Sequence, residues 1–405
     1  MPALTLPLKI AICGAGPVSL TLANILQNNN ISFTIYEASS SIRTQGGSLD
    51  LHPESGQLAL KEAGLWDLFE NYARPESDVM KVVRLDGKVL WDGNSDDKQE
   101  VKETEKFDGR PEIDRRALLK LLSEKLHREN IVFGKKLREV VSSRAAENKY
   151  DLNFADGTTA TDFDFVVGGD GAWSKVRKFL SDEMPRYSGI SMVSSSLNDV
   201  KNNPWLMEYV GQGSVMSFGK DTVVMSQRGD DGYLLAYAAL RVPQDFLNTC
   251  GIDWTDAAAA RKEYKEKYFS HVGKDLQRIF LESTDDLGLR PLYELPVGFN
   301  WPSRSGVTLI GDAAHVMTPF AGVGVNVGMT DALILGREII DVCAGRKTLD
   351  EATQAYEKEM IPRATKFAQR TLHGKENHFS ANGAQEFADM LRSHHAERKF
   401  GQGKA

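Results

Sequence analysis

Three short motifs along the chain combine glycines with an acidic side chain, the combination that proteins use to hold phosphates and sugars. The first is Gly14-Ala15-Gly16, which follows the apolar run Ile10 to Cys13. The second is Gly169-Asp170-Gly171, and the third runs from Gly311-Asp312 through Pro319 to Asn326. Glycine lets the backbone approach a phosphate closely, and a carboxylate accepts hydrogen bonds from sugar hydroxyls. The chemistry indicated is the binding of a nucleotide.

The first motif lies in a strand–helix–strand pattern. A helical pattern follows Gly16, a second strand is predicted over Ile31 to Tyr36, and Glu37 stands at its end. The first turn of the helix would offer unpaired N–H groups and the positive end of its dipole to a pyrophosphate. Glu37 lies roughly 20 residues after the glycines, where an acid accepts from a ribose hydroxyl. Ser19 occupies the third glycine position, where a small serine can substitute at modest cost.

The other two motifs each follow a predicted buried strand, Phe163 to Val167 and Gly306 to Ile310. Asp312 therefore stands at the carboxyl end of a strand, where α/β sheets bind ligands. The glycines before Asn326 begin a long predicted helix whose dipole could stabilise negative charge on a reduced flavin ring. Taken alone, the second motif also allows an ordinary strand–helix turn in which Asp170 caps the helix. His315 is predicted to be structural rather than a general base.

Composition limits the class of protein. The chain has 405 residues, 41% of them hydrophobic and 26% charged, so it is long enough for two globular domains. Its net charge of −7 argues against nucleic acid as a main partner. It shows no membrane span and no secretion signal. Cys13, Cys250 and Cys343 fit neither a disulfide framework nor a metal site, which favours a cytoplasmic setting.

The pattern predicts a discontinuous nucleotide domain of α/β class over 1–186 and 302–345. Short alternating runs separated by turns predict an inserted antiparallel sheet over 187–301, and a C-terminal helical segment follows over 346–405. Residues 79–92 are predicted to join the inserted sheet, as two strands with a type I′ turn at Asp86-Gly87. Helices are expected over Gly56 to Leu65 and, opened by Asp114, over 115–127.

Taken together, the motifs resemble those of the class A flavoprotein monooxygenases, the para-hydroxybenzoate hydroxylase-like family. The resemblance covers essentially the whole chain and rests on GAGPVS, Glu37, DFDFVVGGDGAWSKVR and GDAAHVMTPFAGVGVN. Within that family, GGSLDLH, EIDRRAL and PFAGVGVN are similar to stretches of the tetracycline-inactivating monooxygenases. The fold this implies is an α/β, Rossmann-like FAD-binding domain with an inserted antiparallel β-sheet substrate domain and a C-terminal helix.

The resemblance also implies roles for individual residues. FAD would be bound by Gly14, Gly16 and Glu37, with Arg115 near the pyrophosphate or ribityl chain. Asp312 would accept from the ribityl hydroxyls. The isoalloxazine would lie beside a set of loop and helix residues, with Arg43 also facing the nicotinamide: Arg43, Asp50, Pro319, Gly322, Gly324, Val325 and Asn326. Asp170 and Gly171 match the motif that the family uses where FAD and NADPH are handled.

Two departures bear on the substrate. Val323 replaces the glutamine that the family usually has beside the flavin, and Tyr237 stands where a tetracycline site would have a histidine. The inserted sheet offers Glu208, Arg228 and Tyr237 as candidate substrate contacts, which differ from those of a tetracycline site. A smaller or differently decorated aromatic or polyketide-like substrate is therefore expected.

The reaction that the resemblance implies is hydroxylation through a flavin hydroperoxide, with NADPH or NADH and O2 as co-substrates. The cofactor would carry the chemistry, so no catalytic acid or nucleophile is singled out. Two alternatives stay open at this stage. One is a flavin oxidase or dehydrogenase that inserts no oxygen, and the other is a non-catalytic escort protein on the same fold.

Overall fold

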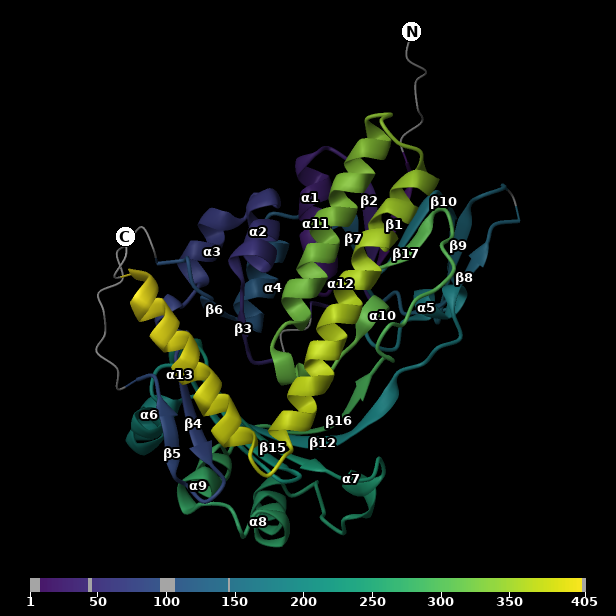
Figure 1. Cartoon of the computed structure of the whole chain (residues 1–405). Helices are drawn as coiled ribbons and strands as arrows, with labels where there is room; N and C mark the ends of the chain where they lie inside the picture. Colours follow the sequence, from purple (N-terminus) through teal and green to yellow (C-terminus); the bar gives the residue numbers. More distant parts are fainter. Residues whose placement is uncertain (1–7, 43–45, 95–105, 145, 403–405) are drawn as a thin grey trace. The chain divides into compact units, whose positions relative to one another are not determined.

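The structure is a computed structural model and describes residues 8–42, 46–94, 106–144 and 146–402. The chain folds into two compact units. Unit 1 holds residues 1–73, 113–186 and 293–371, and unit 2 holds 74–112, 187–292 and 372–405. In the part of the chain that the structure describes, no helix has the length and apolar character needed to cross a membrane. The α/β class predicted from the sequence is confirmed (Figure 1).

A five-stranded sheet forms the centre of unit 1, in the order β17-β11-β1-β2-β7. Its central strand β1 is buried at every position and pairs in parallel with both β11 and β2. Burial on both faces explains why the sequence of this strand is an unbroken apolar run. The strands span Ile10–Cys13 (β1), Phe33–Tyr36 (β2), Ile131–Val132 (β7), Phe165–Gly168 (β11) and Val307–Leu309 (β17).

The remaining elements of unit 1 lie around this sheet. They are α1 (Pro17–Asn28), β3 (Ser48–Asp50), α2 (Leu58–Glu62), α3 (Trp66–Tyr72), β6 (Glu112–Asp114), α4 (Arg115–Glu124), β8 (Leu137–Ser142), β9 (Tyr150–Phe154), β10 (Thr159–Phe163), α5 (Lys175–Leu180), α10 (Asp312–His315) and α11 (Gly324–Cys343). Helix α12 (Leu349–His378) belongs to unit 1 as far as Thr371, and its remaining residues belong to unit 2. Strands β8, β9 and β10 form a small separate sheet, and β3 pairs with β6. Helices α1 and α11 pack closely against each other.

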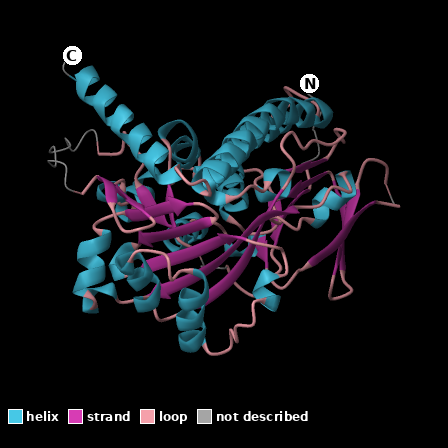
Figure 2. Ribbon diagram, turned by 60° about the horizontal axis from the view of Figure 1, so that its bottom comes forward, coloured by secondary structure: helices cyan, strands magenta, loops and turns pink. Residues whose placement is uncertain are grey.

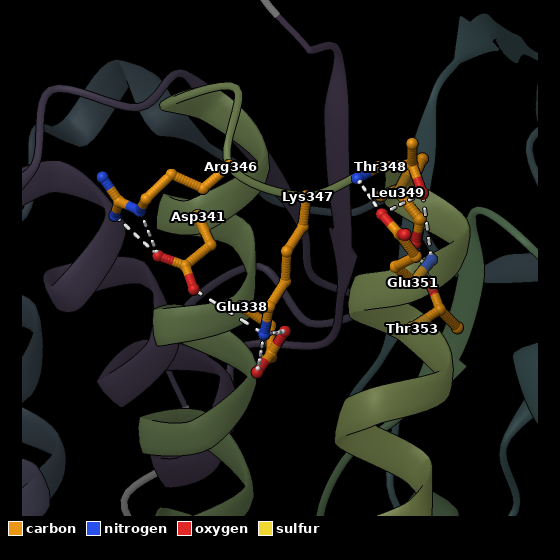
Figure 3. A network of polar contacts seen from close by, with 8 residues as sticks. All are labelled: Glu338, Asp341, Arg346, Lys347, Thr348, Leu349, Glu351 and Thr353. Atoms are coloured by element: carbon orange, nitrogen blue, oxygen red, sulfur yellow. Dashed lines mark hydrogen bonds and ion pairs between the residues drawn. The ribbon is translucent and has the colours of Figure 1, made fainter.

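A capping box fixes the start of α12. The Thr348 N–H donates to Glu351 Oε2 at 2.8 Å, and the Glu351 N–H donates back to Thr348 Oγ1 at 3.2 Å (Figure 3). Such reciprocal bonds satisfy two N–H groups that a helix start leaves without a helical partner. In the preceding turn, Lys347 Nζ donates to Glu338 Oε1 at 2.7 Å. The connection from α11 to α12 is thereby held by polar side chains on both sides of the turn.

Unit 2 is built on a seven-stranded sheet in the order β16-β12-β15-β14-β13-β4-β5 (Figure 2). Most neighbours are antiparallel, but β13 and β4 are parallel. The strands span Met80–Arg84 (β4), Val89–Asp92 (β5), Arg186–Leu197 (β12), Ser214–Gly219 (β13), Thr222–Arg228 (β14), Leu234–Arg241 (β15) and Leu287–Glu294 (β16). The helices span Pro204–Val210 (α6), Phe246–Thr249 (α7), Ala257–Tyr268 (α8), Lys274–Glu282 (α9) and Gly383–Gln402 (α13).

The two faces of this sheet differ. One face packs with α6, α8 and α9 into a hydrophobic core that includes Val193, Val224, Ala238 and Tyr264. Side chains alternate along a strand, so the opposite face carries the residues in between. We call one line of cross-strand partners on that opposite face the methionine–tyrosine row; it consists of Val82, Met216, Met225, Tyr237 and Ser194.

The C-terminal helix covers one end of this second face. Helix α13 packs against β13, β4 and β5. Phe218, which lies two residues from Met216 on β13, contacts Phe387 of α13 with ring centroids 5.5 Å apart. Met216, Met225 and Tyr237 stay half-buried. The middle of the face therefore keeps part of its surface exposed, and flexible thioethers and a phenol line it.

Two local predictions were wrong. The helix expected over Gly56 to Leu65 begins earlier, with a π-helical turn over Pro53–Gln57 that leads into α2. The turn after β4 has a positive φ at Gly87 but not at Asp86, so it is not type I′, which requires both. Instead Gly87 N–H donates to Arg84 O at 2.8 Å, and Arg84 N–H donates to Lys88 O at 2.8 Å. A three-residue loop with glycine in its third position gives this pattern.

Candidate functional site

The two glycines of the first motif serve different purposes. Gly14 has a φ of +92° and its N–H donates to Tyr36 O at 2.8 Å. A Cβ atom at Gly14 would lie 2.6 Å from Gly169 O, so the packing of the first and second motifs excludes a side chain. Gly16, which directly precedes α1, has no atom within 4 Å of its Cβ position. Gly14 thus permits a contact within the chain, whereas Gly16 faces open space at a helix N-terminus.

Glu37 is bonded to the glycine loop itself. Its Oε2 accepts from the Ala15 N–H at 2.8 Å, and its Oε1 accepts from the Ser39 N–H at 2.8 Å. Each carboxylate oxygen has further lone-pair capacity, so both can also accept from ribose hydroxyls. Glu37 therefore fixes the loop in the shape that a dinucleotide requires, in addition to the ribose contact proposed for it.

Asp170 of the second motif caps α5. Its carboxylate accepts from the Lys175 N–H at 2.7 Å and from the Ser174 hydroxyl. Burial raises the pKa of the Asp170 carboxyl, and these hydrogen bonds counteract the shift. The capping interpretation that its sequence position also allowed describes this side chain. Gly171 has a φ of +81° and open space at its Cβ position. A ligand that reaches this turn would therefore contact the backbone.

Arg177 joins the second and third motifs, a role that sequence reasoning missed. Its side chain is 1% exposed and donates to Ala313 O at 2.8 Å and to Ala172 O. Burial lowers the pKa of its guanidinium, although nearby acids including Asp170 oppose the shift. Only the type of residue, an arginine directly after a glycine-rich turn, could have suggested this role.

Asp312 is presented by a strained glycine. Gly311, with a φ of +58°, follows β17 and turns the chain so that Asp312 begins α10. The Asp312 carboxylate is exposed, and no hydrogen-bond partner for it is found among the described residues. A carboxylate free to accept hydroxyl hydrogen bonds fits the ribityl contact proposed from the motif.

Asn326 holds the start of α11 against the chain around Asp50. Its Oδ1 accepts from the His52 N–H at 2.9 Å, and its Nδ2 donates to Asp50 O at 2.8 Å. Oδ1 also lies 3.3 Å from the Gly56 N–H. The side chain is 2% exposed. The Asn326 side chain therefore positions the loop around Asp50, and the backbone at the start of α11 stays available to a ligand.

The glycines before Asn326 leave their backbone uncovered by side chains. Gly322 adopts a φ of +64°, and its Cβ position lies 3.9 Å from Asp50 Oδ1. Gly324, the first residue of α11, has open space at its Cβ position. Val325 is half-buried beside it, and Pro319 is exposed at the start of the preceding 3-10 turn. Val323, by contrast, is 2% exposed and packs inward.

The third motif is also tied to the first. A Cβ atom at Gly328 of α11 would lie 2.5 Å from Val18 Cγ2 of α1, and one at Gly311 would lie 3.2 Å from the same atom. The glycines therefore let the two helices and the β17 turn approach one another. All three motifs are brought together within unit 1, as their shared chemistry requires.

His315 is a structural residue in this arrangement. Its Nε2 lies 2.6 Å from Asp331 Oδ2, and Asp331 also accepts from the Gly311 N–H and pairs with Arg363, each at 2.9 Å. Burial favours the neutral form of both groups, but their mutual attraction outweighs it. The pKa of His315 is therefore raised and that of Asp331 lowered. The network connects the third motif to α11 and α12.

The structure describes only one of the two arginines proposed near the cofactor. Arg115 begins α4, and its Cδ lies 2.3 Å from the Cβ position of Gly46, so the side chain crosses directly over that glycine. The Arg115 N–H donates to Gly47 O at 3.1 Å. Arg43 lies outside the described residues.

The three candidate substrate residues are not brought together. Glu208, expected within or at the border of the strands, is instead exposed on α6, a helix that packs with the other face of the sheet. Arg228 ends β14 and donates to Gly211 O at 2.9 Å, which fixes a turn. Tyr237 belongs to the methionine–tyrosine row. Burial raises the pKa of its phenol, and the positive charge of Arg290 opposes that shift.

The site in unit 1 fits FAD. Two helices, α1 and α11, begin beside glycines with open Cβ positions, and each presents N–H groups and a positive dipole end. Glu37 and Asp312 supply carboxylates for hydroxyl groups. Asp50, Gly322 and Gly324 outline a place where a planar ring can meet the backbone.

Comparison with known families agrees with this geometry. The chain belongs to the family described as FAD binding domain, whose model matches residues 8–371. Monooxygenase penA of Penicillium thymicola is 28% identical, covering 95% of this chain and 98% of that protein. 6-Methylsalicylate 1-monooxygenase atA of Aspergillus terreus is 28% identical, covering 81% of this chain and 73% of that protein. The protein is thus an FAD-dependent monooxygenase of the class that its motifs resemble.

Solved structures share the fold. Klebsiella pneumoniae HpxO, complexed with FAD and uric acid, superposes with a TM-score of 0.75 at 20% identity, covering 95% of this chain and 93% of its own. The tetracycline destructase Tet(55) gives a TM-score of 0.70 at 17% identity, covering 96% and 95%. The likeness to tetracycline-inactivating enzymes is therefore one of several within the fold.

Proposed function

We propose that this monooxygenase hydroxylates an aromatic or polyketide-like small molecule that binds on the methionine–tyrosine row of unit 2. The observation that carries the proposal is the partly exposed middle of that sheet face, where Met216, Met225 and Tyr237 lie side by side across three strands. Methionine side chains adapt to flat apolar surfaces, and an aromatic ring packs well against both thioethers and a phenol.

The proposed reaction consumes one molecule each of O2 and NAD(P)H. One oxygen atom is inserted into a C–H bond of the substrate and gives a hydroxyl group. The other is reduced to water by the two electrons of NAD(P)H, with uptake of one proton. FAD, when bound, takes up those electrons and activates O2.

The residues of this chain supply binding and electrostatics. Glu37 and the start of α1 would hold the adenosine and pyrophosphate portion, and Asp312 would hold the ribityl chain. The N-terminus of the 20-residue helix α11 would stabilise negative charge on the flavin ring. Asn326 keeps that helix start in register with Asp50. Three cysteines without disulfide partners support a reducing, cytoplasmic setting for this chemistry.

The test is to supply ¹⁸O2 to purified protein with NADPH and a panel of phenolic and polyketide compounds. Labelled oxygen in a product, with one NADPH consumed for each product formed, is the expected result. NADPH consumption with hydrogen peroxide and no labelled product for any compound would instead indicate an oxidase. A colourless protein that binds no FAD would indicate a binding protein on the same fold.

A further inference from the structure

A carboxylate and an imidazole lie beside the open glycines at the start of α11. Asp50 ends β3, and its Oδ1 lies 3.9 Å from the Cβ position of Gly322. Its Oδ2 lies 2.9 Å from Nε2 of His52, whose side chain is only 11% exposed. Asp50 therefore has one oxygen near the backbone proposed for the flavin ring and the other bonded to a buried imidazole.

The partner of His52 determines which way this hydrogen bond runs. A carboxylate only accepts hydrogen bonds, so His52 Nε2 carries the hydrogen and donates it to Asp50 Oδ2. Within the described part of the chain, Asp50 Oδ1 has no hydrogen-bond partner, and the side chain keeps 31% of its surface exposed. The bond to His52 thus fixes the carboxylate through one oxygen and leaves the other available to face a ligand.

Asn326 fixes the backbone on which both side chains stand. Its Nδ2 donates to Asp50 O at 2.8 Å, and its Oδ1 accepts from the His52 N–H at 2.9 Å. Both bonds come from a side chain near the start of α11, so the pair cannot shift away from that helix end without breaking them. The negative charge of Asp50 is thereby held next to the positive end of the α11 dipole.

These two charges have opposite effects on a flavin ring bound beside them. Reduction adds negative charge to the ring, which the dipole of α11 favours and a neighbouring carboxylate disfavours. A carboxylate held at this place lowers the reduction potential of the ring. Electrons taken from NAD(P)H are then passed on to O2 more readily.

Resting on the FAD site of the proposed function, we infer that Asp50 lowers the reduction potential of the bound flavin. We assign His52 as the positioning residue that holds the Asp50 carboxylate beside the ring. His52 acts only through Asp50 in this arrangement, so its effect on the potential disappears once residue 50 carries no charge.

The experiment measures the reduction potential of the FAD-loaded protein against a reference dye, and the dissociation constants of oxidised and reduced FAD. In Asp50→Asn, the affinity for reduced FAD relative to oxidised FAD should rise about tenfold, which raises the potential by about 30 mV for a two-electron couple. Asp67→Asn removes the same charge from an exposed position on α3. It is the matched control and should leave the potential unchanged.

Two variants of His52 test the positioning role. His52→Leu removes the donor, so the carboxylate can turn away from the ring, and the potential should rise by less than in Asp50→Asn. His52→Gln keeps a donor for Asp50 and should stay close to the wild type. Combined with Asp50→Asn, His52→Leu should cause no further change, because the two substitutions act on the same charge.

A purely structural role predicts a different result. Loss of packing weakens the binding of oxidised and reduced FAD alike, and equal weakening does not move the potential. An unchanged or lowered potential in Asp50→Asn overturns the inference, and an effect of His52→Leu that persists in the Asp50→Asn background overturns the positioning role. Labelled product together with either result leaves the proposed function standing, whereas a wild-type protein that binds no FAD overturns both. Thermal unfolding of each apoprotein verifies that the variants are folded.

Discussion

Ser19 Oγ lies only 2.1 Å from the position that a Cβ atom on Gly169 would occupy. Ser19 takes the place of the third glycine of the dinucleotide fingerprint, where the helix approaches the strands closely. It is fully buried, and the room for its hydroxyl exists because residue 169 has no side chain. The glycine missing from the first motif is compensated in the second. The two motifs are therefore a matched pair in packing.

Gly16→Ala and Gly169→Ala should distinguish a glycine that leaves room for a ligand from one that leaves room for a neighbouring side chain. Gly16 has an ordinary negative φ and an open Cβ position, so alanine there should leave the apoprotein stable. It should weaken FAD binding by roughly tenfold or more, because the methyl group fills the space that we propose for the pyrophosphate. Titration with FAD and thermal unfolding of the apoprotein measure the two effects.

For Gly169→Ala we expect the opposite pattern, a loss of stability of about 1–3 kcal/mol from overpacking against Ser19. Adding Ser19→Ala should recover much of that loss, because it removes the Oγ atom in the clash. A double variant no more stable than Gly169→Ala alone would show that the clash lies elsewhere.

Asp312→Ala should greatly weaken FAD binding. An exposed carboxylate at this turn accepts hydrogen bonds from hydroxyl groups, and bonds to a charged group contribute about 1.5–3 kcal/mol each. Asp312→Asn keeps an acceptor and should show a smaller loss. The measurement is the FAD dissociation constant, with the flavin content of the protein as purified as a second readout. A fully loaded, yellow Asp312→Ala protein would rule out the assignment.

Glu37→Ala should weaken FAD binding without unfolding the protein. The substitution removes the acceptor for the Ala15 and Ser39 N–H groups and with it the proposed ribose contact. Glu37→Gln retains acceptors for those groups only in part, so its FAD dissociation constant should fall between those of the wild type and Glu37→Ala. Circular dichroism of the apoproteins serves as the control for folding. An unchanged dissociation constant in Glu37→Ala would contradict the fingerprint interpretation.

The buried pair of His315 and Asp331 should make stability depend on pH in a defined direction. The folded pKa of His315 is raised, so its contribution is fully present below its ordinary value of 6.5 and is lost as pH rises through the folded pKa. The folded pKa of Asp331 is lowered, so its contribution is present above 3.8 and is lost as pH falls through its folded pKa.

His315→Gln should therefore destabilise the protein most between those two values, by about 3–5 kcal/mol, and least at alkaline pH. Thermal unfolding of both proteins across pH measures the difference. Because the role is structural, FAD-loaded His315→Gln should keep its turnover at temperatures well below unfolding. A constant difference in stability across pH would mean that the pair is not charged in the folded protein.

Arg228→Ala and Tyr237→Phe should have different effects, although the sequence suggested similar roles. Arg228 bonds to Gly211 O, so its loss should lower stability by about 1.5–3 kcal/mol and leave the coupling of NADPH to product unchanged. Tyr237→Phe should leave stability and FAD content normal while it raises the Michaelis constant for substrate. If Tyr237→Phe changes neither the Michaelis constant nor the coupling, the substrate does not bind on this face.

Local signals were enough to predict the main elements of the nucleotide domain. The apolar run of β1, the glycines before α1 and the long periodic helix α11 each depend on neighbouring residues. The same holds for Asp312 at a strand end. The exposed Glu208 could also have been placed correctly. Asn203 caps α6 by accepting from the Leu206 N–H at 3.2 Å, and Pro204 is its first residue, which together are a standard helix start.

Features that depend on distant partners could not be predicted in this way. Asn326 accepts from the His52 N–H, 274 residues away in sequence, and no local pattern at either residue indicates the other. The same applies to Arg177, whose acceptor Ala313 O is 136 residues away, and to the compensation between Ser19 and Gly169. The turn at Gly87 depends on a backbone angle that the residue types alone do not fix.

The parallel sheet of unit 1 also affects how the chain folds during synthesis. Strand β1 leaves the ribosome before β11 and β17, yet Ile10 pairs with Phe165, and Val166 of β11 pairs in turn with Val307. A nascent chain that ends before β17 keeps one edge of an apolar strand uncovered. Pairing over such separations is slow, and exposed strand edges invite association with other chains. Slower elongation or premature termination between β11 and β17 is therefore expected to yield aggregates, and chaperones that shield strand edges should raise the yield of folded enzyme.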